Sequence, residues 1–112
     1  TVVLRADPRA EKFGVLGIDA AGDVVTFRGE HLINRPVAKP LMYTGCMVLS
    51  RDILKFMPQK GSVFSITRGT LRAVLESQER VCSFQYDGYW NDIGTIESLE
   101  KARLISANGI LG

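Results

Sequence analysis

Residues 41–49 form an almost uninterrupted apolar run, in which Thr44 and Gly45 are the main departures. A run of this length without alternating polar residues is typical of a strand that is buried on both faces. Strands of this kind occur in parallel or mixed sheets that lie beneath helices. The run therefore predicts that the chain folds around a mixed or parallel sheet with helices packed on it.

Strand-like and helical segments alternate along the rest of the chain. Further strands are predicted at residues 1–4, 13–19, 24–27 and 81–86, and helices at residues 51–57, 67–78 and 96–107. The turn that contains Gly22 predicts a β-hairpin, and Ser50 and Thr95 are predicted to cap helices. Residues 7–12 and 28–40 are expected to be loops. This alternation predicts the α/β class.

The charge balance limits the classes of partner that this chain is expected to bind. Fourteen basic and twelve acidic residues alternate in sign along the chain and give a net charge of +2. Nucleic-acid-binding and membrane-surface proteins need clustered Lys and Arg, so neither kind of partner is expected. No apolar stretch approaches the roughly eighteen residues that span a bilayer, and a soluble, cytoplasmic protein is expected. Cys46 and Cys82 lie in apolar runs and are expected to be buried, reduced thiols.

Two short segments carry candidate chemistry. Residues 88–95, Gly-Tyr-Trp-Asn-Asp-Ile-Gly-Thr, set the carboxylate of Asp92 between two glycines just before a predicted helix. A lone Asp in such a turn is usually a capping or turn residue. The second segment places Gly45 inside the apolar run, where a glycine marks either a β-bulge or a close approach by a ligand or another backbone. Taken singly, each segment has an ordinary structural explanation.

Taken together and in this order, the segments resemble the sugar-1-phosphate nucleotidyltransferases. Similarity to that family extends over its hairpin (residues 13–25), its Thr-Gly strand and the helix after it (residues 42–58), and its Gly-Tyr-Trp-x-Asp-Ile-Gly-Thr ending (residues 88–99). One such motif would be weak evidence, but three at the right order and spacing are strong. The resemblance implies a Rossmann-like fold and transfer of a nucleoside monophosphate from an NTP to a sugar 1-phosphate, with release of pyrophosphate.

The resemblance also implies roles for individual residues. Asp92 corresponds to the catalytic carboxylate that holds Mg²⁺ together with a second Asp from the N-terminal half of the domain. Two anions must approach each other in this reaction, and a cation neutralises the charge that accumulates between them. Thr44 and Gly45 match the strand that contacts the sugar, where the missing side chain of the glycine lets backbone groups approach the hydroxyls.

Two further candidates for binding the sugar phosphate match the family less well. Many members carry a Glu-Lys-Pro triplet after the hairpin that grips this phosphate. Here Glu30 lies near the expected place without a following lysine, and Lys39 precedes Pro40 further along, so both are also compatible with solvated loop residues. The departure resembles the guanylyl- and uridylyltransferases that act on mannose, heptose or MurNAc 1-phosphate. Trp90 is expected to pack beneath the Asp92 turn rather than to stack on a base.

The family's glycine-rich phosphate loop and its first metal-binding Asp have no counterpart in these 112 residues. The resemblance therefore implies that residues 1–112 are the C-terminal portion of the catalytic domain, inactive without a missing N-terminal half. Two alternatives remain: a non-catalytic module that binds a sugar phosphate or regulates a partner, and a scaffold piece ordered by another chain. If half the sheet is missing, its exposed strand edges favour homo-oligomers.

Overall fold

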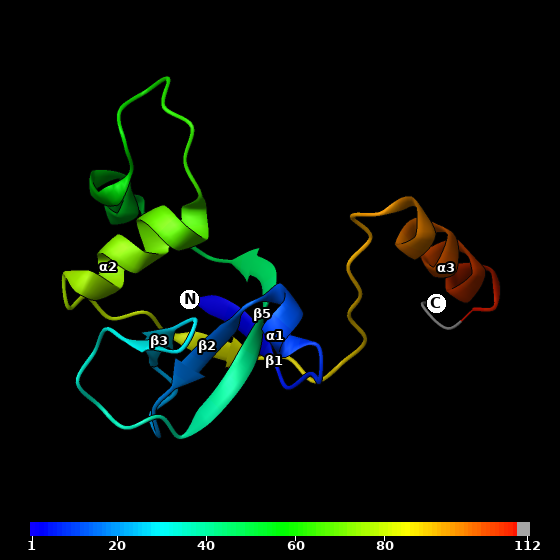
Figure 1. Ribbon diagram of the computed structural model, residues 1–112, viewed down its shortest axis with the longest axis horizontal. Coiled ribbons are helices and arrows are strands. Elements are labelled where there is room, and N and C mark those ends of the chain that lie inside the picture. The colour runs from blue at the N-terminus through cyan, green and yellow to red at the C-terminus, as the bar shows by residue number, and fades with distance from the viewer. Residues whose placement is uncertain (110–112) are drawn as a thin grey trace.

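The computed structural model describes residues 1–109, and its centre is a six-stranded mixed sheet. From one edge to the other the strands follow the order β4-β3-β2-β5-β1-β6 (Figure 1). The strands are β1 (Val2–Arg5), β2 (Val15–Ile18), β3 (Val24–Phe27), β4 (Glu30–His31), β5 (Lys39–Met47) and β6 (Ser83–Gln85). β1 and β6 run parallel, whereas the other neighbouring strands are antiparallel. With the helices described below, this mixed sheet confirms the α/β class.

The predicted hairpin is β2–β3, and its turn is built around two buried carboxylates. Asp19 accepts hydrogen bonds from the backbone N–H groups of Ala21, at 3.0 Å, and Asp23, at 2.9 Å. Arg35 lies 2.8 Å from the Asp19 carboxylate. Arg80 donates to both carboxylate oxygens of Asp23, at 2.9 and 3.0 Å. These bonds tie the hairpin turn to the segments that lead into β5 and β6.

The main core lies between the sheet and α2 (Arg72–Glu76), which continues from a π-helical turn at Ile66–Leu71. Three apolar residues at helical spacing in this segment, Leu71, Val74 and Leu75, are all buried. They belong to one cluster with strand residues Val2, Leu4, Leu16, Ile18, Val24, Val25, Phe27 and Leu41. Helical structure thus occurs where the sequence predicts a helix at residues 67–78, but its first part is π-helical and the α-helix itself spans only Arg72–Glu76.

Only the first half of the apolar run at residues 41–49 is buried. Leu41 and Met42 are buried in β5, but Val48 is 73% exposed. The prediction of a strand covered on both faces is therefore wrong for the second half of the run. Cys46 is exposed and Cys82 is half-buried, so the expectation of two buried thiols is wrong as well.

A β-bulge at Gly45 explains this change in burial. Leu4 of β1 pairs with Tyr43 of β5, whereas Val2 pairs with Met47. Two steps along β1 therefore correspond to four steps along β5, and the extra residues bulge out of the ladder. Gly45 takes a φ of +91°, a conformation that favours glycine. The bulge interpretation of this glycine is confirmed.

The segment at residues 28–40 contains more regular structure than predicted. Arg28 and Gly29 both have positive φ, +50° and +85°, which is the geometry of a tight two-residue hairpin turn. The chain therefore returns as β4, in which Glu30 pairs with Phe27. β5 begins at Lys39, so the irregular loop is confined to the residues between these two strands.

Two short helical segments also differ from the predictions. The loop expected at residues 7–12 contains α1 (Ala10–Phe13), a single helical turn. The helix expected at residues 51–57 is a 3₁₀ helix, Arg51–Phe56, and the Ser50 side chain makes no capping hydrogen bond. Beyond this helix the chain projects from the body of the molecule before it returns to α2 (Figure 1).

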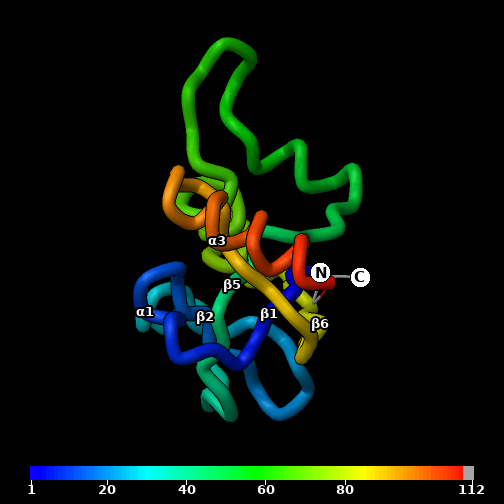
Figure 2. Tube along the Cα trace, turned by 90° about the vertical axis from the view of Figure 1, so that its right-hand side faces the viewer, coloured from blue at the N-terminus to red at the C-terminus, as the bar shows by residue number. Residues whose placement is uncertain are grey.

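The last helix, α3 (Ile96–Ala107), begins at Thr95 as predicted. The Thr95 hydroxyl accepts the backbone N–H of Ser98, and the Ser98 hydroxyl accepts that of Thr95, each at 3.1 Å. None of the α3 residues is buried, and the helix stands apart from the sheet at the end of an extended linker (Figure 1). Figure 2 turns this side toward the viewer, so α3 lies in front of the sheet. No helix within residues 1–109 is long and apolar enough to cross a membrane.

Candidate functional site

Trp90 joins the Asp92 segment to the bulged strand. Its indole N–H donates a hydrogen bond of 2.9 Å to the backbone carbonyl of Thr44 in β5. The Trp90 ring packs edge-to-face on Phe13, with 5.2 Å between the ring centroids. This half-buried position agrees with the packing role expected for Trp90. The contact brings the two segments singled out in the sequence, residues 43–46 and 88–95, to the same part of the molecule.

Asp7 is the centre of a charged cluster beside this junction. Its side chain is only 1% exposed. Arg9 donates from Nε to one carboxylate oxygen and from Nη2 to the other, both at 2.8 Å, and its backbone N–H adds a third bond of 2.8 Å. Arg5 also forms an ion pair with Asp7. The hydrogen bonds from Arg9, with the added positive charge of Arg5, hold the pKa of the Asp7 carboxyl far below its ordinary value.

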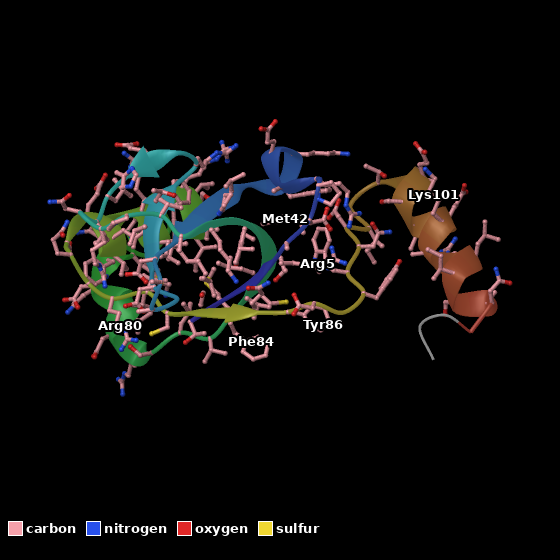
Figure 3. The ribbon with its side chains drawn as sticks, turned by 90° about the horizontal axis from the view of Figure 1, so that it is seen from below. Arg5, Met42, Arg80, Phe84, Tyr86 and Lys101 are labelled. Atoms are coloured by element: carbon pink, nitrogen blue, oxygen red, sulfur yellow. The ribbon has the colours of Figure 1, made fainter. Side chains whose placement is uncertain are left out.

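The two arginines of this cluster also hold the segment that carries Asp92. Arg5 donates from Nε to the carbonyl of Gly88 at 2.9 Å. Arg9 donates from Nη2 to the Trp90 carbonyl at 3.3 Å and from Nη1 to the Asn91 side-chain oxygen at 3.1 Å. In Figure 3, Arg5 lies between the sheet and the linker that leads to α3. The residues immediately before Asp92 are thus fixed by side chains from the start of the chain.

The Asp92 carboxylate differs from that of Asp7 in its lack of bonding partners in the described part of the chain. It is half-buried, and no hydrogen bond or ion pair to its carboxylate occurs within residues 1–109. A Cβ atom on Gly94 would lie 3.3 Å from its Oδ2, so the glycine leaves space for the carboxylate. The described residues hold no cluster of three or more His, Cys, Asp or Glu side chains suited to a metal. Mg²⁺ commonly takes only one or two carboxylates alongside waters and phosphates, so Asp92 fits as a single ligand of a shared site.

Thr44 and Gly45 have different relations to the surface. The Thr44 hydroxyl donates to the Val3 carbonyl at 2.8 Å, and the backbone carbonyl of Thr44 accepts a hydrogen bond from the Trp90 indole. Both of these polar groups are therefore occupied within the protein. Gly45 is exposed, and a Cβ atom built on it would meet nothing within 4 Å. The open position beside the Asp92 segment is therefore at Gly45, with Thr44 holding the strand beneath it.

Glu30 and Lys39 lie elsewhere. Glu30 is on β4, at the opposite edge of the sheet from β6, and pairs with Arg72 of α2 at 2.7 Å. Lys39 begins β5, and its Nζ lies 3.4 Å from the side-chain oxygen of Gln85. Gly45 lies six steps along β5 from Lys39, which corresponds to about 20 Å. The structure therefore joins the Asp92 segment, through Trp90, to the strand that carries Thr44 and Gly45, and no hydrogen bond or ion pair links that segment to Glu30 or Lys39 within residues 1–109.

A comparison with known families shows which family this chain belongs to. The family model described as nucleotidyl transferase matches residues 1–108. The chain belongs to this family. Curated relatives include two proteins named glucose-1-phosphate adenylyltransferase, from Desulfitobacterium hafniense strains DSM 10664 / DCB-2 and Y51. Each is 32% identical over an alignment of 102 positions, and the match covers 85% of this chain and 24% of the relative. The chain thus spans about a quarter of the length of these relatives.

For this nucleotidyl transferase chain, the match includes all six strands, the bulge and the Asp92 segment. It also includes the cluster of Arg5, Asp7 and Arg9, which the sequence analysis missed because residues 7–12 were expected to be a solvated loop. One signal could have indicated it: Arg, Asp and Arg alternate at positions 5, 7 and 9. In an extended chain, alternate residues point to the same side.

Proposed function

We propose that this chain is the sugar-phosphate side of the catalytic domain of a sugar-1-phosphate nucleotidyltransferase, in the C-terminal portion of that domain. An oxygen of the sugar 1-phosphate attacks the α-phosphorus of an NTP, the bond to the β-phosphate breaks, and pyrophosphate leaves with the NDP-sugar as the other product. The observation that carries the proposal is the half-buried Asp92 carboxylate, which has no hydrogen-bond or ion-pair partner within residues 1–109. It lies on a segment that Trp90 joins to the strand with the open bulge at Gly45. No protein nucleophile is needed.

In this proposal Asp92 supplies one oxygen ligand for Mg²⁺. The bound ion would neutralise the negative charge of the approaching phosphates. A carboxylate that already makes ion pairs within its own chain would have to give up those partners to bind a cation. Asp92 has no such partner among the described residues, which supports the assignment. The remaining ligands would come from substrate phosphates, water and the part of the domain that precedes this chain.

Gly45 would contact the sugar through its backbone. The open space around its Cα lets a ligand approach the N–H and C=O groups more closely than any side chain would permit. Thr44 would not contact the sugar through its hydroxyl; its bonds to Val3 and Trp90 would instead hold the bulge at Gly45 in place. Glu30 and Lys39 take part only if a substrate-bound state moves them, and Glu30 would first have to leave Arg72.

The degenerate Glu-Lys-Pro region supports a guanylyl- or uridylyltransferase acting on mannose, heptose or MurNAc 1-phosphate. The two relatives, in contrast, are named as adenylyltransferases of glucose 1-phosphate. A panel of ATP, GTP and UTP against these sugar 1-phosphates separates the two assignments. Product formation with GTP or UTP but not with ATP and glucose 1-phosphate would support the first.

The test of the proposal uses the full-length protein that carries this chain. Asp92→Asn removes the charge of the ligand and keeps its shape, and we expect pyrophosphate release to fall by about 100-fold or more. Asp87→Asn is the matched control, because Asp87 lies on the same linker and is exposed. If Asp92→Asn retains activity within a few-fold of the wild type, the metal-ligand assignment is wrong.

A second candidate function is a non-catalytic module that binds a sugar phosphate. It is favoured by the separation of Glu30 and Lys39 from Asp92. Calorimetric binding of a sugar 1-phosphate by the full-length protein, without pyrophosphate release for any NTP in the panel, would support this candidate over the enzyme.

A further inference from the structure

The segment that carries Asp92 has little structure of its own. Residues 86–95 form an extended linker between β6 and α3, with no helix or strand. Tyr86, Tyr89 and Ile93 along it are all exposed, so apolar packing holds the linker at Trp90, against Phe13, rather than along its length. Further contacts must define where the Asp92 carboxylate lies.

Polar bonds from the other end of the chain fill this role. Arg5 binds the carbonyl of Gly88, and Arg9 binds the carbonyl of Trp90 and the side chain of Asn91. The Arg9 contacts are the ones adjacent to Asp92. The Arg9 guanidinium carbon also lies 5.3 Å from the centroid of the Trp90 ring, a distance at which a cation and an aromatic ring attract each other.

Asp7 fixes the orientation of Arg9. Its two oxygens accept Nε and Nη2 of the guanidinium, each at 2.8 Å, in a paired arrangement that defines the plane of the group. Because the guanidinium is planar and rigid, this leaves Nη1 directed at Asn91. Asp7, Arg9 and Asn91 therefore form a continuous chain of bonds that ends one residue before Asp92.

We propose that Arg9, oriented by Asp7, is a positioning residue that sets the place of the Asp92 carboxylate. The inference rests on the proposed role of Asp92 as a metal ligand. It adds the hydrogen bonds that would hold this ligand in place within an extended linker. Arg9 touches neither metal nor substrate. It acts through Asn91 and Trp90, as residues that orient metal ligands do in other sites.

This role requires the shape of the guanidinium and not only its charge. A lysine ammonium is a single point of charge on a flexible stem, without the fixed fork of donors that an arginine presents. It cannot bind both oxygens of Asp7 and also reach Asn91 and the Trp90 carbonyl in one fixed geometry. Arg9→Lys is therefore expected to behave like Arg9→Ala. If Arg9 served only to add positive charge near the site, Arg9→Lys would behave like the wild type.

The experiment measures Mn²⁺ binding to the full-length protein by electron paramagnetic resonance, with Mn²⁺ standing in for Mg²⁺. We expect Arg9→Ala and Arg9→Lys to weaken Mn²⁺ binding by about tenfold or more, and Asn91→Ala to weaken it less, because it removes only one bond. Arg51→Ala removes the same charge from an exposed position on the 3₁₀ helix and is expected to match the wild type. Asn91→Ala also keeps the test valid if the Arg9 variants fold poorly.

A second readout does not depend on the metal. In protein labelled with fluorotryptophan, the ¹⁹F resonance of Trp90, assigned with Trp90→Phe, reports the position of the linker. We expect this resonance to shift or broaden in both Arg9 variants and to stay unchanged in Arg51→Ala. Unchanged Mn²⁺ affinity and an unchanged Trp90 resonance in Arg9→Ala would overturn the inference, and so would full rescue by Arg9→Lys.

The outcomes also separate this inference from the proposed function. If the wild-type protein neither binds Mn²⁺ nor releases pyrophosphate, the proposed function is wrong, and so is the role of Arg9 in serving a metal ligand. If the wild type is active and binds Mn²⁺ while the Arg9 variants match it in both readouts, only the positioning role is wrong.

Discussion

The hairpin turn at residues 19–23 and the linker at residues 86–95 both present carboxylates, but the chain treats them in opposite ways. In the turn, Asp19 and Asp23 are buried and engaged by backbone N–H groups and by Arg35 and Arg80. In the linker, the Asp92 carboxylate has no partner among the described residues. A carboxylate that serves folding is neutralised within the chain, whereas one left half-buried and unpaired is available to an external cation.

Asp7 belongs with the turn carboxylates although it lies next to the linker. It is as fully engaged as Asp19, and its partners then hold the residues before Asp92. An ion-paired carboxylate, Asp7, and one that is unpaired within the described residues, Asp92, thus lie in neighbouring parts of the molecule. Substituting each kind tests the comparison: loss of an ion-paired carboxylate should lower stability, and loss of the unpaired one should lower activity.

The largest effect on stability is expected from Asp7→Asn, which leaves Arg5 and Arg9 without their shared anion. The pKa of Asp7 is strongly lowered in the folded protein, mainly by the hydrogen bonds from Arg9. The unfolded chain therefore takes up the proton first as the pH falls. The stabilisation is fully present above the ordinary carboxyl pKa of about 4 and is lost as the pH falls below it.

Melting temperatures of wild type and Asp7→Asn at pH 7, 5, 4 and 3 check this prediction. We expect the variant to melt lower at pH 7 and to depend less on pH below about 5. Part of the acid sensitivity should persist in the variant, because hydrogen bonding to the backbone N–H of Asp23 and the charge of Arg35 also lower the pKa of Asp19. An identical pH dependence in the two proteins would show that Asp7 is not one of the carboxylates that serve folding.

Asp23→Ala tests the hairpin turn and should have a smaller effect. Asp23 is buried, but its partner Arg80 is 67% exposed, so loss of the carboxylate is partly compensated by solvent. We expect the free energy of unfolding to fall by about 1–2 kcal/mol, seen as a lower urea midpoint. Asp52→Ala, an exposed acid on the 3₁₀ helix, should change it by no more than about 0.5 kcal/mol. Equal effects of the two substitutions would contradict the distinction drawn here.

Local patterns in the sequence predicted much of the fold, but contacts between residues far apart in the chain could not be predicted from it. The hairpin follows from its turn residues, and the buried face of α2 from helical spacing. The cluster around Asp7 depends on bonds between residues 82 and 83 positions apart, from Arg9 to Asn91 and from Arg5 to Gly88. No period or turn motif encodes such pairs.

The same reasoning explains the errors at the apolar run. Hydropathy predicted burial of the whole run, because it is a property of the residues alone. The bulge at Gly45 depends on how β5 pairs with β1, and it exposes Cys46 and the residues beyond. For the candidate site, the motifs indicated Asp92, Gly45 and Trp90, whereas Arg5 and Arg9, which also hold the Asp92 segment, lie in none of these motifs.

The smallest effect is expected at the far end of the linker, where Thr95 caps α3. Removing this cap by Thr95→Ala typically costs a helix about 1 kcal/mol. Because no α3 residue is buried, that loss should stay within the helix and leave the cooperative unfolding of the sheet unchanged. Hydrogen exchange of the full-length protein checks this: amides of α3 should exchange faster in Thr95→Ala, while those of β1 and β5 keep their protection. If the sheet also lost protection, α3 would be coupled to the core. The linker would then be held from both ends rather than by Arg5, Arg9 and Trp90 alone.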